Sequence, residues 1–363
     1  MLGMALWLKS KVSKLVRMKR RLHKWFCLFV GMFCVFQAEA YDLRLNGIYY
    51  EIDGDELVVT NETDKEDSNS YSGIVIIPSE ITYGGRVYTV TGIKARAFQN
   101  CSGVTRVEMP STVTHIGDFA FSVCSNLTSI NIPPYITSIG QYAFSSTAIG
   151  SIVIPNTIKN ISNGTFFRCN NLRTIEIPNS VIAIGESAFA LCENLELVSI
   201  GESVESIGPS SFAFCSKLKS MMIPSRVHDI GIYAFSLCNE LKEVHVQASI
   251  PPIIDAETFS DYNKTLYVPI NCSDAYRVSE YWKNFEYIVE SADESAIESI
   301  VNEKHRIYVV GHTLHVENRE DIYRVYNLIG QIVYTGSDRV VRLSDSGVYV
   351  ICTKESSFKV VVR

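Results

Sequence analysis

The chain has 363 residues, of which 47% are hydrophobic and 20% charged, a composition typical of a globular protein and not of a disordered one. Residues 1–40 carry eight Lys/Arg and one Asp/Glu, which leaves 25 basic and 38 acidic residues, a net charge of −13, in the remainder. Because nucleic-acid phosphates require a basic surface, this acidic remainder argues against nucleic acid as a partner.

The first forty residues have the layout of a secretory signal peptide. Four basic residues at positions 19–24 precede an apolar run from Trp25 to Phe36, and the small-x-small sequence Ala38-Glu39-Ala40 follows it. We therefore predict cleavage near Ala40 and a mature chain that begins near Tyr41, outside the cytoplasm.

Three alternatives concern this segment. Met18 is a possible true start, because residues 1–17 add nothing that such a signal requires. The apolar run could instead be an uncleaved membrane anchor, although it is shorter than the roughly 20 residues that a membrane-spanning helix needs. Lipoprotein cleavage before Cys34 is disfavoured, because the preceding residue is Phe33 and not a small one.

Residues 41–90 are predicted to form an N-terminal β cap. Residues 41–60 fit a hairpin with a polar turn at Asp53-Gly54-Asp55, and residues 71–90 fit strands on either side of Tyr83-Gly84-Gly85. The acidic stretch 61–70 between them fits an exposed loop. A cap is needed here because the segment that follows is an open array of repeats.

A unit of about 23 residues recurs across residues 91–265, and each copy contains a phenylalanine. Successive phenylalanines are separated by 23, 23, 22, 23, 23, 23 and 24 residues. They are Phe98, Phe121, Phe144, Phe166, Phe189, Phe212, Phe235 and Phe259. A fixed period of this length predicts a solenoid, in which each unit buries its apolar residues only against its neighbours.

Residues 116–138 show the pattern of one unit. Apolar and polar side chains alternate over residues 127–132, which predicts a short strand that ends at Pro133. A second apolar segment follows, and Gly140 then permits a tight turn. Residues 142–144 fit a single helical turn that places the Phe144 ring inside the coil. We expect successive coils to lie ~4.8 Å apart.

Six cysteines each lie three residues after a phenylalanine, and Thr147 takes this position in the third unit. They are Cys101, Cys124, Cys169, Cys192, Cys215 and Cys238. Stacked cysteines could approach disulfide distance, but free cysteine commonly packs as a small buried hydrophobe. We therefore expect a buried ladder of free thiols and no metal site, since no histidine recurs in step. Cys272 and Cys352 could be bridged or free.

The array is predicted to end in a C-terminal cap at residues 266–290. This stretch keeps the strand and proline of the repeat and then fits a helix. Tyr276, Tyr281, Trp282 and Phe285 lie at helical spacings, and we expect them to cover the last turn and not to bind an aromatic ligand. Residues 291–303 are predicted to be an acidic linker.

Residues 304–363 follow a different pattern. Short stretches of alternating side chains are separated by Gly, Asn and Asp turns, which predicts a small C-terminal β-sandwich.

The sequence IGDFAFSVCSNLTSINIPPYITSIG, residues 116–140, resembles the BspA-type leucine-rich repeat family, which occurs on the surfaces of Bacteroidetes, spirochaetes and some protozoa. The resemblance covers about residues 71–270. It implies a right-handed leucine-rich repeat solenoid and a role in adhesion or recognition at the cell surface.

The C-terminal segment carries a second resemblance. The sequences VYNLIGQIV (325–333), SGVYVI (346–351) and the terminal FKVVVR resemble the sorting domains of the Bacteroidetes type IX secretion system. This implies export across the outer membrane, followed by release or attachment at the surface. The chain ends in Arg363 where lysine is more usual, and an ordinary immunoglobulin-like module is the alternative.

The sequence contains no recognisable catalytic constellation. No G-x-S-x-G, H-E-x-x-H or phosphate-binding loop occurs. His312 and His315 are three residues apart, and in a strand this spacing directs their side chains to opposite faces. We therefore predict no enzyme activity, no cofactor and no metal.

Two rows of outward strand positions vary between units while the inside positions repeat. The first outward row is Arg106, Ser129, Ser151, Thr174, Leu197, Ser220 and Glu243; the second outward row is Glu108, Asn131, Val153, Glu176, Ser199, Met222 and His245. Variation on a repeated frame is what a recognition surface requires, although single positions could simply tolerate change. The candidate contact residues are Arg106, Glu108, Asn131, Glu176, Leu197, Met222, Glu243 and His245, with Leu197 and Met222 preferred.

These observations predict a secreted or outer-membrane-surface protein that binds host or surface proteins, with glycans as a second candidate class of partner, without catalysis. Any membrane association would come only from surface attachment. The alternatives are a structural surface scaffold with no dedicated ligand and a glycan-binding accessory protein; the oligomeric state is left open.

Overall fold

The computed structural model describes residues 41–62, 71–291, 307–310, 313–316, 323–327, 332–337, 340–343, 347–352 and 357–362. The predicted signal peptide, most of the acidic loop and nearly all of the linker lie outside the described residues. The chain divides into two compact units. The first contains the described residues up to Leu266 together with Ala275–Ile288, and the second contains Tyr267–Asp274 and the described residues from Val289 onward. No described helix is long and apolar enough to cross a membrane.

The N-terminal end of the first unit is a small β structure. Strands β1 (Leu43–Leu45), β2 (Ile48–Asp53) and β3 (Glu56–Thr60) pair in antiparallel order. Strands β5 (Glu80–Tyr83) and β6 (Arg86–Ile93) form a hairpin, and β6 also pairs in parallel with β3. This connects the cap to the first coil of the repeat array.

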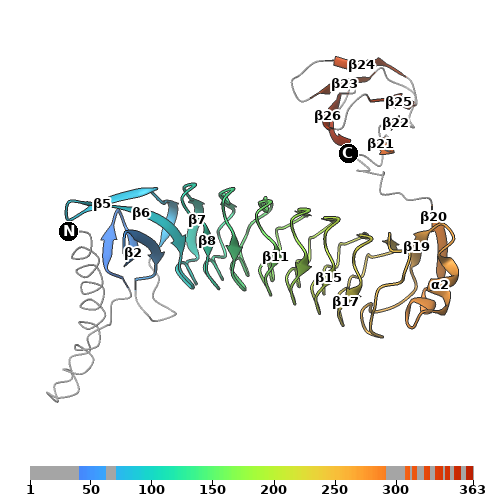
Figure 1. Cartoon of the computed structure of the whole chain (residues 1–363), viewed down its shortest axis with the longest axis horizontal. Helices are drawn as coiled ribbons and strands as arrows, with labels where there is room; N and C mark the ends of the chain where they lie inside the picture. Colours follow the sequence, from blue (N-terminus) through green and yellow to red (C-terminus); the bar gives the residue numbers. More distant parts are fainter. Residues whose placement is uncertain are drawn as a thin grey trace, which may run out of the picture. The chain divides into compact units, whose positions relative to one another are not determined.

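The repeat array is a solenoid, as predicted, with two columns of short parallel strands (Figure 1). The strands of the first column contain most of the residues of the two outward rows. Its strands are β4 (Ser72–Ile76), β7 (Gly103–Glu108), β9 (Ser129–Ile130), β12 (Thr174–Ile177), β14 (Leu197–Ile200), β16 (Ser220–Ile223) and β18 (Glu243–Val246). Pairing such as Thr174 with Leu197 and Ser220 with Glu243 confirms that equivalent positions of successive units are neighbours in space.

The second column is made of two-residue strands that end in an isoleucine. They are β8 (His115–Ile116), β10 (Ser138–Ile139), β11 (Asn160–Ile161), β13 (Ala183–Ile184), β15 (Ser206–Ile207) and β17 (Asp229–Ile230). Each isoleucine is buried between the two columns, so these strands form the second wall of the core.

The core contains a continuous column of phenylalanine rings. The eight repeat phenylalanines are fully buried, and successive ring centroids lie 4.9–5.7 Å apart with the rings nearly parallel. Tyr71 covers the first ring, with a centroid distance of 4.4 Å to Phe98, and Phe285 covers the last, 5.2 Å from Phe259. Other aromatic residues therefore close the column at both ends.

The corner around each phenylalanine is a turn and not the single helical turn that we predicted. The residues two before and two after each of the first seven phenylalanines have left-handed backbones, with φ of +56° at Phe119 and +61° at Val123. In this conformation the N–H of Phe121 donates to the Ala143 carbonyl of the next coil at 2.8 Å. The N–H groups of Phe119 and Val123 likewise donate to carbonyls of the next coil, those of Gln141 and Ser145. A helix would direct these groups back into its own turn, whereas here they tie the coils together.

The glycine that follows five of the six short strands of the second column has a different reason from the one we predicted. Gly140 is not in the left-handed region, so the turn itself does not require glycine. A Cβ at Gly140 would lie 2.5 Å from the backbone nitrogen of Asp118 in the preceding coil. Glycine is needed because the backbones of adjacent coils come too close for a side chain.

The third unit, which has one residue fewer than its neighbours, interrupts both strand columns. The sheets β4-β7-β9 and β6-β8-β10 end before it, and new sheets begin at β12 and at β11. Residues 151–154 are not in a strand, and the structure describes no backbone hydrogen bond from them to either neighbouring coil. The phenylalanine column continues across this point, where its spacing reaches 5.7 Å.

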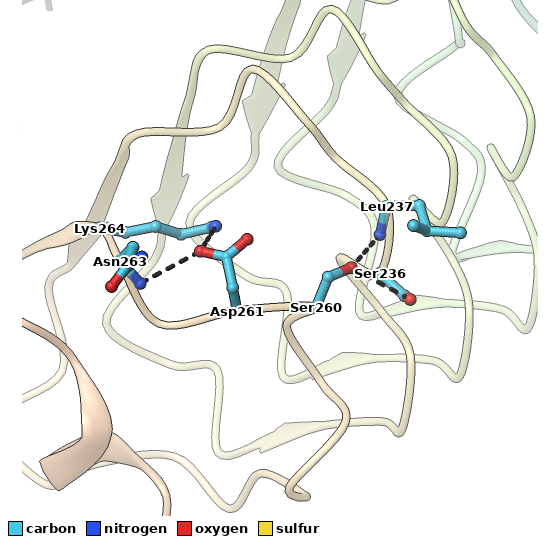
Figure 2. A network of polar contacts seen from close by, with 6 residues as sticks. All are labelled: Ser236, Leu237, Ser260, Asp261, Asn263 and Lys264. Atoms are coloured by element: carbon cyan, nitrogen blue, oxygen red, sulfur yellow. Dashed lines mark hydrogen bonds and ion pairs between the residues drawn. The ribbon is translucent and has the colours of Figure 1, made fainter.

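The last coil is tied to the one before it by side chains, as Figure 2 shows. The Ser260 hydroxyl accepts the Leu237 N–H and lies 3.3 Å from the Ser236 hydroxyl. Asp261 accepts hydrogen bonds from the backbone N–H of Asn263, at 3.1 Å, and from Lys264 Nζ, at 2.7 Å. The Lys264 side chain is only 5% exposed, so this ion pair neutralises a buried cation.

The residues that follow cover the last coil. Helix α2 (Ser273–Val278) carries Tyr276, whose hydroxyl donates to Ala248 at 2.6 Å. The short helix η1 (Trp282–Asn284) carries Trp282, whose indole N–H donates to Pro252 at 2.7 Å. Tyr276, Trp282 and Phe285 are buried, but Tyr281 is only partly covered. Strands β19 (Thr265–Pro269) and β20 (Tyr287–Ser291) contain the points where the two units divide.

The described residues after the linker form two antiparallel sheets. Strands β21 (Ile307–Val310), β22 (Thr313–Val316) and β25 (Val340–Arg342) make the first sheet. Strands β24 (Ile332–Gly336), β23 (Tyr323–Asn327), β26 (Gly347–Cys352) and β27 (Ser357–Val362) make the second, in that order. The strands are consistent with the predicted pattern, while a sandwich packing of the two sheets stays a prediction.

Candidate binding face

The outward rows occupy one face of the first strand column. Arg106 pairs in register with Ser129, Glu176 with Ser199, and Met222 with His245, so the rows keep their register between these neighbouring coils, although the pairing is interrupted at residues 151–154. The residues between the rows, such as Val107 and Ile175, are buried. The alternation of a strand therefore separates a constant inner wall from a variable outer surface.

The candidate residues differ in how much of each side chain is available to a partner. Leu197 is 57% exposed in β14, which is unusual for leucine in a paired strand. Met222, the other preferred residue, is only partly exposed. Of the rest, Arg106, Asn131, Glu176 and Glu243 are exposed, while Glu108 and His245 are partly exposed.

Several charges on this face are paired along a strand. Arg106 contacts Glu108 at 2.9 Å in β7, and Glu243 lies 3.7 Å from His245 in β18. Because both pairs are at the surface, they contribute little to stability. The Arg106–Glu108 pair leaves the first coil of the face locally close to neutral, whereas Glu176 lies between uncharged neighbours.

Asn131 has a structural role that its sequence position does not reveal. Its side-chain oxygen accepts the Met109 N–H at 2.7 Å, and its side-chain N–H donates to the Met109 carbonyl at 2.8 Å. Backbone pairing between β7 and β9 stops at Ile130, and the Asn131 amide provides the next pair of hydrogen bonds between these two coils. A partner could therefore use only the remaining donor and acceptor capacity of the Asn131 amide without breaking these hydrogen bonds.

The structure also shows apolar residues that the candidate set omitted. Val153 of the second outward row is 83% exposed, and Ile74 and Ile76 of β4 are each 62% exposed. Ile74 pairs with Arg106 and Ile76 with Glu108, so these two isoleucines extend both rows by one strand. The signal was present in the sequence, since Ile74-Val75-Ile76-Ile77-Pro78 repeats the strand-and-proline pattern one unit before the first phenylalanine.

The six repeat cysteines are buried with free thiols, which confirms the expected ladder. The Sγ atoms of Cys124 and Cys192, for example, donate to the carbonyls of Phe98 and Phe166 at 3.0 and 3.1 Å. Burial raises the pKa of Cys169 to about 11 and the pKa values of Cys101 and Cys238 to about 12. The thiols are therefore protonated at neutral pH and are poor nucleophiles.

The described residues hold no cluster that fits metal binding. No group of three or more His, Cys, Asp or Glu side chains in this part of the chain is arranged to hold a metal ion. Cys272 is partly exposed with a free thiol. His312 lies outside the described residues.

Comparison with known structures agrees with the solenoid fold. A leucine-rich repeat protein from Bacteroides ovatus ATCC 8483 is 29% identical, over 69% of this chain and 72% of that one, with a TM-score of 0.51. A leucine-rich cell surface protein from Faecalibacterium prausnitzii A2-165 is 20% identical, over 70% of this chain and 95% of that one, with a TM-score of 0.38. The second likeness is too distant to support a comparison of detail. No curated protein matches the chain.

The repeats match a described family. Six copies of the BspA type leucine-rich repeat region match residues 81–169 and 137–266, which together span just over half of the chain. The match includes every coil that contributes a candidate residue. The chain therefore belongs to the BspA-type leucine-rich repeat family.

Proposed function

We propose that this protein is a secreted or surface-exposed binding protein that recognises other proteins through the two outward rows and performs no catalysis. The observation that carries this proposal is the contrast between the rows and the core. Inside positions keep a phenylalanine, a cysteine or an aliphatic side chain in nearly every coil, whereas the outward rows change in charge, size and polarity and include the exposed Leu197 and Val153. Solenoids of this kind offer extended surfaces for protein recognition.

The proposed location outside the cytoplasm rests on the signal-peptide pattern in residues 1–40. The resemblance of the last sixty residues to a type IX sorting domain supports export across the outer membrane, followed by attachment or release. We expect the partners to be host or surface proteins, with glycans as a further possibility for the same face.

Substitutions on the outward rows test the proposal. A panel of extracellular-matrix proteins would be screened for binding to the mature chain, and variants Glu176→Lys, Met222→Glu and Leu197→Glu would be measured against the strongest partner. We expect Leu197→Glu to weaken binding about tenfold, because it places a charge in an apolar contact, and Met222→Glu to have a smaller effect because that side chain is partly covered.

Ile182→Glu is the matched control, because Ile182 is an exposed aliphatic residue beside the second strand column and away from both rows. The face assignment would be contradicted if Ile182→Glu and Leu197→Glu reduced binding equally. It would also be contradicted if a folded double variant, Glu176→Lys with Leu197→Glu, bound the partner as well as the unmodified chain. Absence of any partner in the screen would favour the structural scaffold.

A further inference from the structure

Strand β4 is an edge strand. In the sheet β4-β7-β9 it is the terminal member, and no other strand of the described residues pairs with its outer side. The corresponding end of the second column is closed, since β6 pairs there with β3. Within the described residues, the N-terminal cap therefore covers one column of the solenoid and leaves the other with an open edge.

The backbone groups at this edge belong to Ile74 and Ile76. The N–H of Ile77 donates to Glu108 of β7 at 2.9 Å. Because successive residues of a strand direct their N–H and C=O groups to opposite edges, Val75 and Ile77 bond to β7 while Ile74 and Ile76 point outward. Unpaired backbone groups of this kind are a template for another strand.

The same two residues also expose their side chains. Ile74 and Ile76 are each 62% exposed on the outward face, while Val75 between them is buried. Natural edges are usually protected by charged residues, proline or bulges. Here a bulge at Gly73 precedes the edge and Pro78 follows it, but residues 74–77 contain neither a charge nor a proline.

We propose that β4 is a second binding site, which accepts an extended peptide segment of a partner protein as an added strand. The pairing segment is uncharged and apolar at alternate positions, because Arg106 and Glu108 beside the isoleucines neutralise each other at 2.9 Å. Backbone hydrogen bonds to Ile74 and Ile76 hold the segment, and its apolar side chains pack over the two isoleucines. This site adjoins the N-terminal end of the outward rows and differs from them in using the backbone groups at the edge of β4.

A peptide fits this edge better than a second copy of the chain. The edge is four residues long, and pairing of two such edges falls well short of the roughly 1,200–2,000 Å² that a stable protein interface buries. A flexible peptide can add contacts over the exposed isoleucines that two rigid solenoid ends cannot make.

The probe is a fluorescein-labelled peptide, Lys-Thr-Val-Thr-Val-Thr-Val-Lys amide, titrated against residues 41–363 and followed by anisotropy. Its control is the same peptide with N-methyl groups on two consecutive central residues, which keeps charge and side chains but removes a pairing N–H from whichever edge of the peptide faces β4. We expect saturable binding of the first peptide and about tenfold weaker binding of the second, the size expected for lost backbone hydrogen bonds.

The chain variants are Ile76→Pro, Ile76→Lys and the control Ile182→Lys. Ile76→Pro removes an outward N–H that β7 does not use, so the solenoid should keep its circular-dichroism spectrum while peptide affinity falls about tenfold. Ile76→Lys should also lower peptide affinity. Ile182→Lys adds the same charge at an exposed aliphatic residue outside both rows and should leave affinity within about twofold.

Amide hydrogen exchange shows whether the edge of β4 is open in the free chain and whether the peptide pairs with it. In the free chain we expect fast exchange at Ile74 and Ile76 and slow exchange at Val75 and Ile77, with protection of the first pair on adding peptide. The proposal is overturned if the peptide does not bind, if binding ignores both N-methylation and Ile76→Pro, or if Ile74 and Ile76 are already protected in the free monomer. Self-association that Ile76→Pro abolishes would identify a second copy as the occupant and would also overturn it.

Discussion

The repeat cysteines show what a single residue contributes to each coil. Every one of the six lies in the core, and all but Cys101 donate from Sγ to a phenylalanine carbonyl of the preceding coil. Thr147 fills the same position in the third unit, where its hydroxyl donates to Phe144 at 2.9 Å and lies 3.4 Å from Cys169 Sγ. The position therefore requires a small side chain with a hydrogen-bond donor.

Replacement of one ladder cysteine tests this requirement. We expect Cys192→Ala to lower the free energy of unfolding by ~1–2 kcal/mol, because it removes buried volume and the hydrogen bond to Phe166. Cys272→Ala, at a partly exposed thiol, should change it by less than ~0.5 kcal/mol. Urea unfolding followed by circular dichroism measures both, and equal effects of the two substitutions would contradict the proposed role of the ladder.

The buried thiols also predict how stability depends on pH. In the unfolded chain these thiols titrate near a pKa of 9.0, whereas in the folded chain burial raises the pKa of Cys169 to about 11 and of Cys238 to about 12. The folded state therefore keeps protons that the unfolded state releases, and the free energy of unfolding falls as pH rises above about 9, by up to ~1.4 kcal/mol per pH unit for each thiol. Below pH 8 the thiols should contribute no pH dependence.

Thermal melts between pH 7 and 10 would measure this effect. The comparison is a double variant, Cys169→Thr with Cys192→Thr, which copies the residue found at position 147. Its melting temperature should fall less between pH 8.5 and pH 10 than that of the unmodified chain. Identical curves for the two proteins would show that other groups cause the alkaline loss.

At the scale of elements, the third unit is the weak point of the strand columns. It is one residue shorter than its neighbours, and both columns break beside it. Ile130, Ile132 and Ile152 are partly exposed there, although the equivalent residues of the later units are buried. One missing residue is sufficient to break both strand columns, because strand pairing requires each coil to present the same length of backbone.

Restoring that residue should repair the columns. An asparagine inserted between Ala148 and Ile149 would match Asn126, Asn171 and Asn194, each of which donates from its side chain to the preceding coil. We expect an increase of ~1–2 kcal/mol in the free energy of unfolding, from new backbone hydrogen bonds at residues 151–154, and slower amide exchange there. The same insertion between Ser125 and Asn126, in a unit of full length, should destabilise the protein.

At the scale of the whole solenoid, stability depends on contacts between neighbouring coils and on the end caps. Trp282 is buried, bonds to Pro252 and lies 6.1 Å from the last ring of the phenylalanine column. We expect Trp282→Ala to cost ~3–5 kcal/mol and to speed amide exchange in the coil of Phe259 much more than in the coil of Phe121.

A uniform loss of protection along the solenoid would contradict this local response. The measurement should follow exchange coil by coil, because repeat arrays need not unfold in one step. Val278→Ala, an exposed change at the end of helix α2, is the matched control and should leave exchange unchanged.

The candidate site was only partly predictable. Spacing alone assigned Arg106, Glu176 and Leu197 to an outer surface, because strand alternation fixes which side chains point inward. It could not show that Asn131 is engaged by Met109 or that Met222 is half covered, since both depend on neighbouring coils. It also left out Ile74 and Ile76, whose importance comes from the open edge of β4.

The repeat period by itself determined that this chain is a solenoid, which residues form its core, and where the phenylalanines and cysteines stack. These properties follow from a pattern that is local and repeated, so any packing of the units must bury the same residues. The tertiary structure alone decided that the phenylalanine corners are left-handed turns, that the glycines avoid a clash between coils, and that the strand columns break at the third unit. Each of these depends on the distance and register between one coil and the next, which are set by contacts more than twenty residues apart in the sequence.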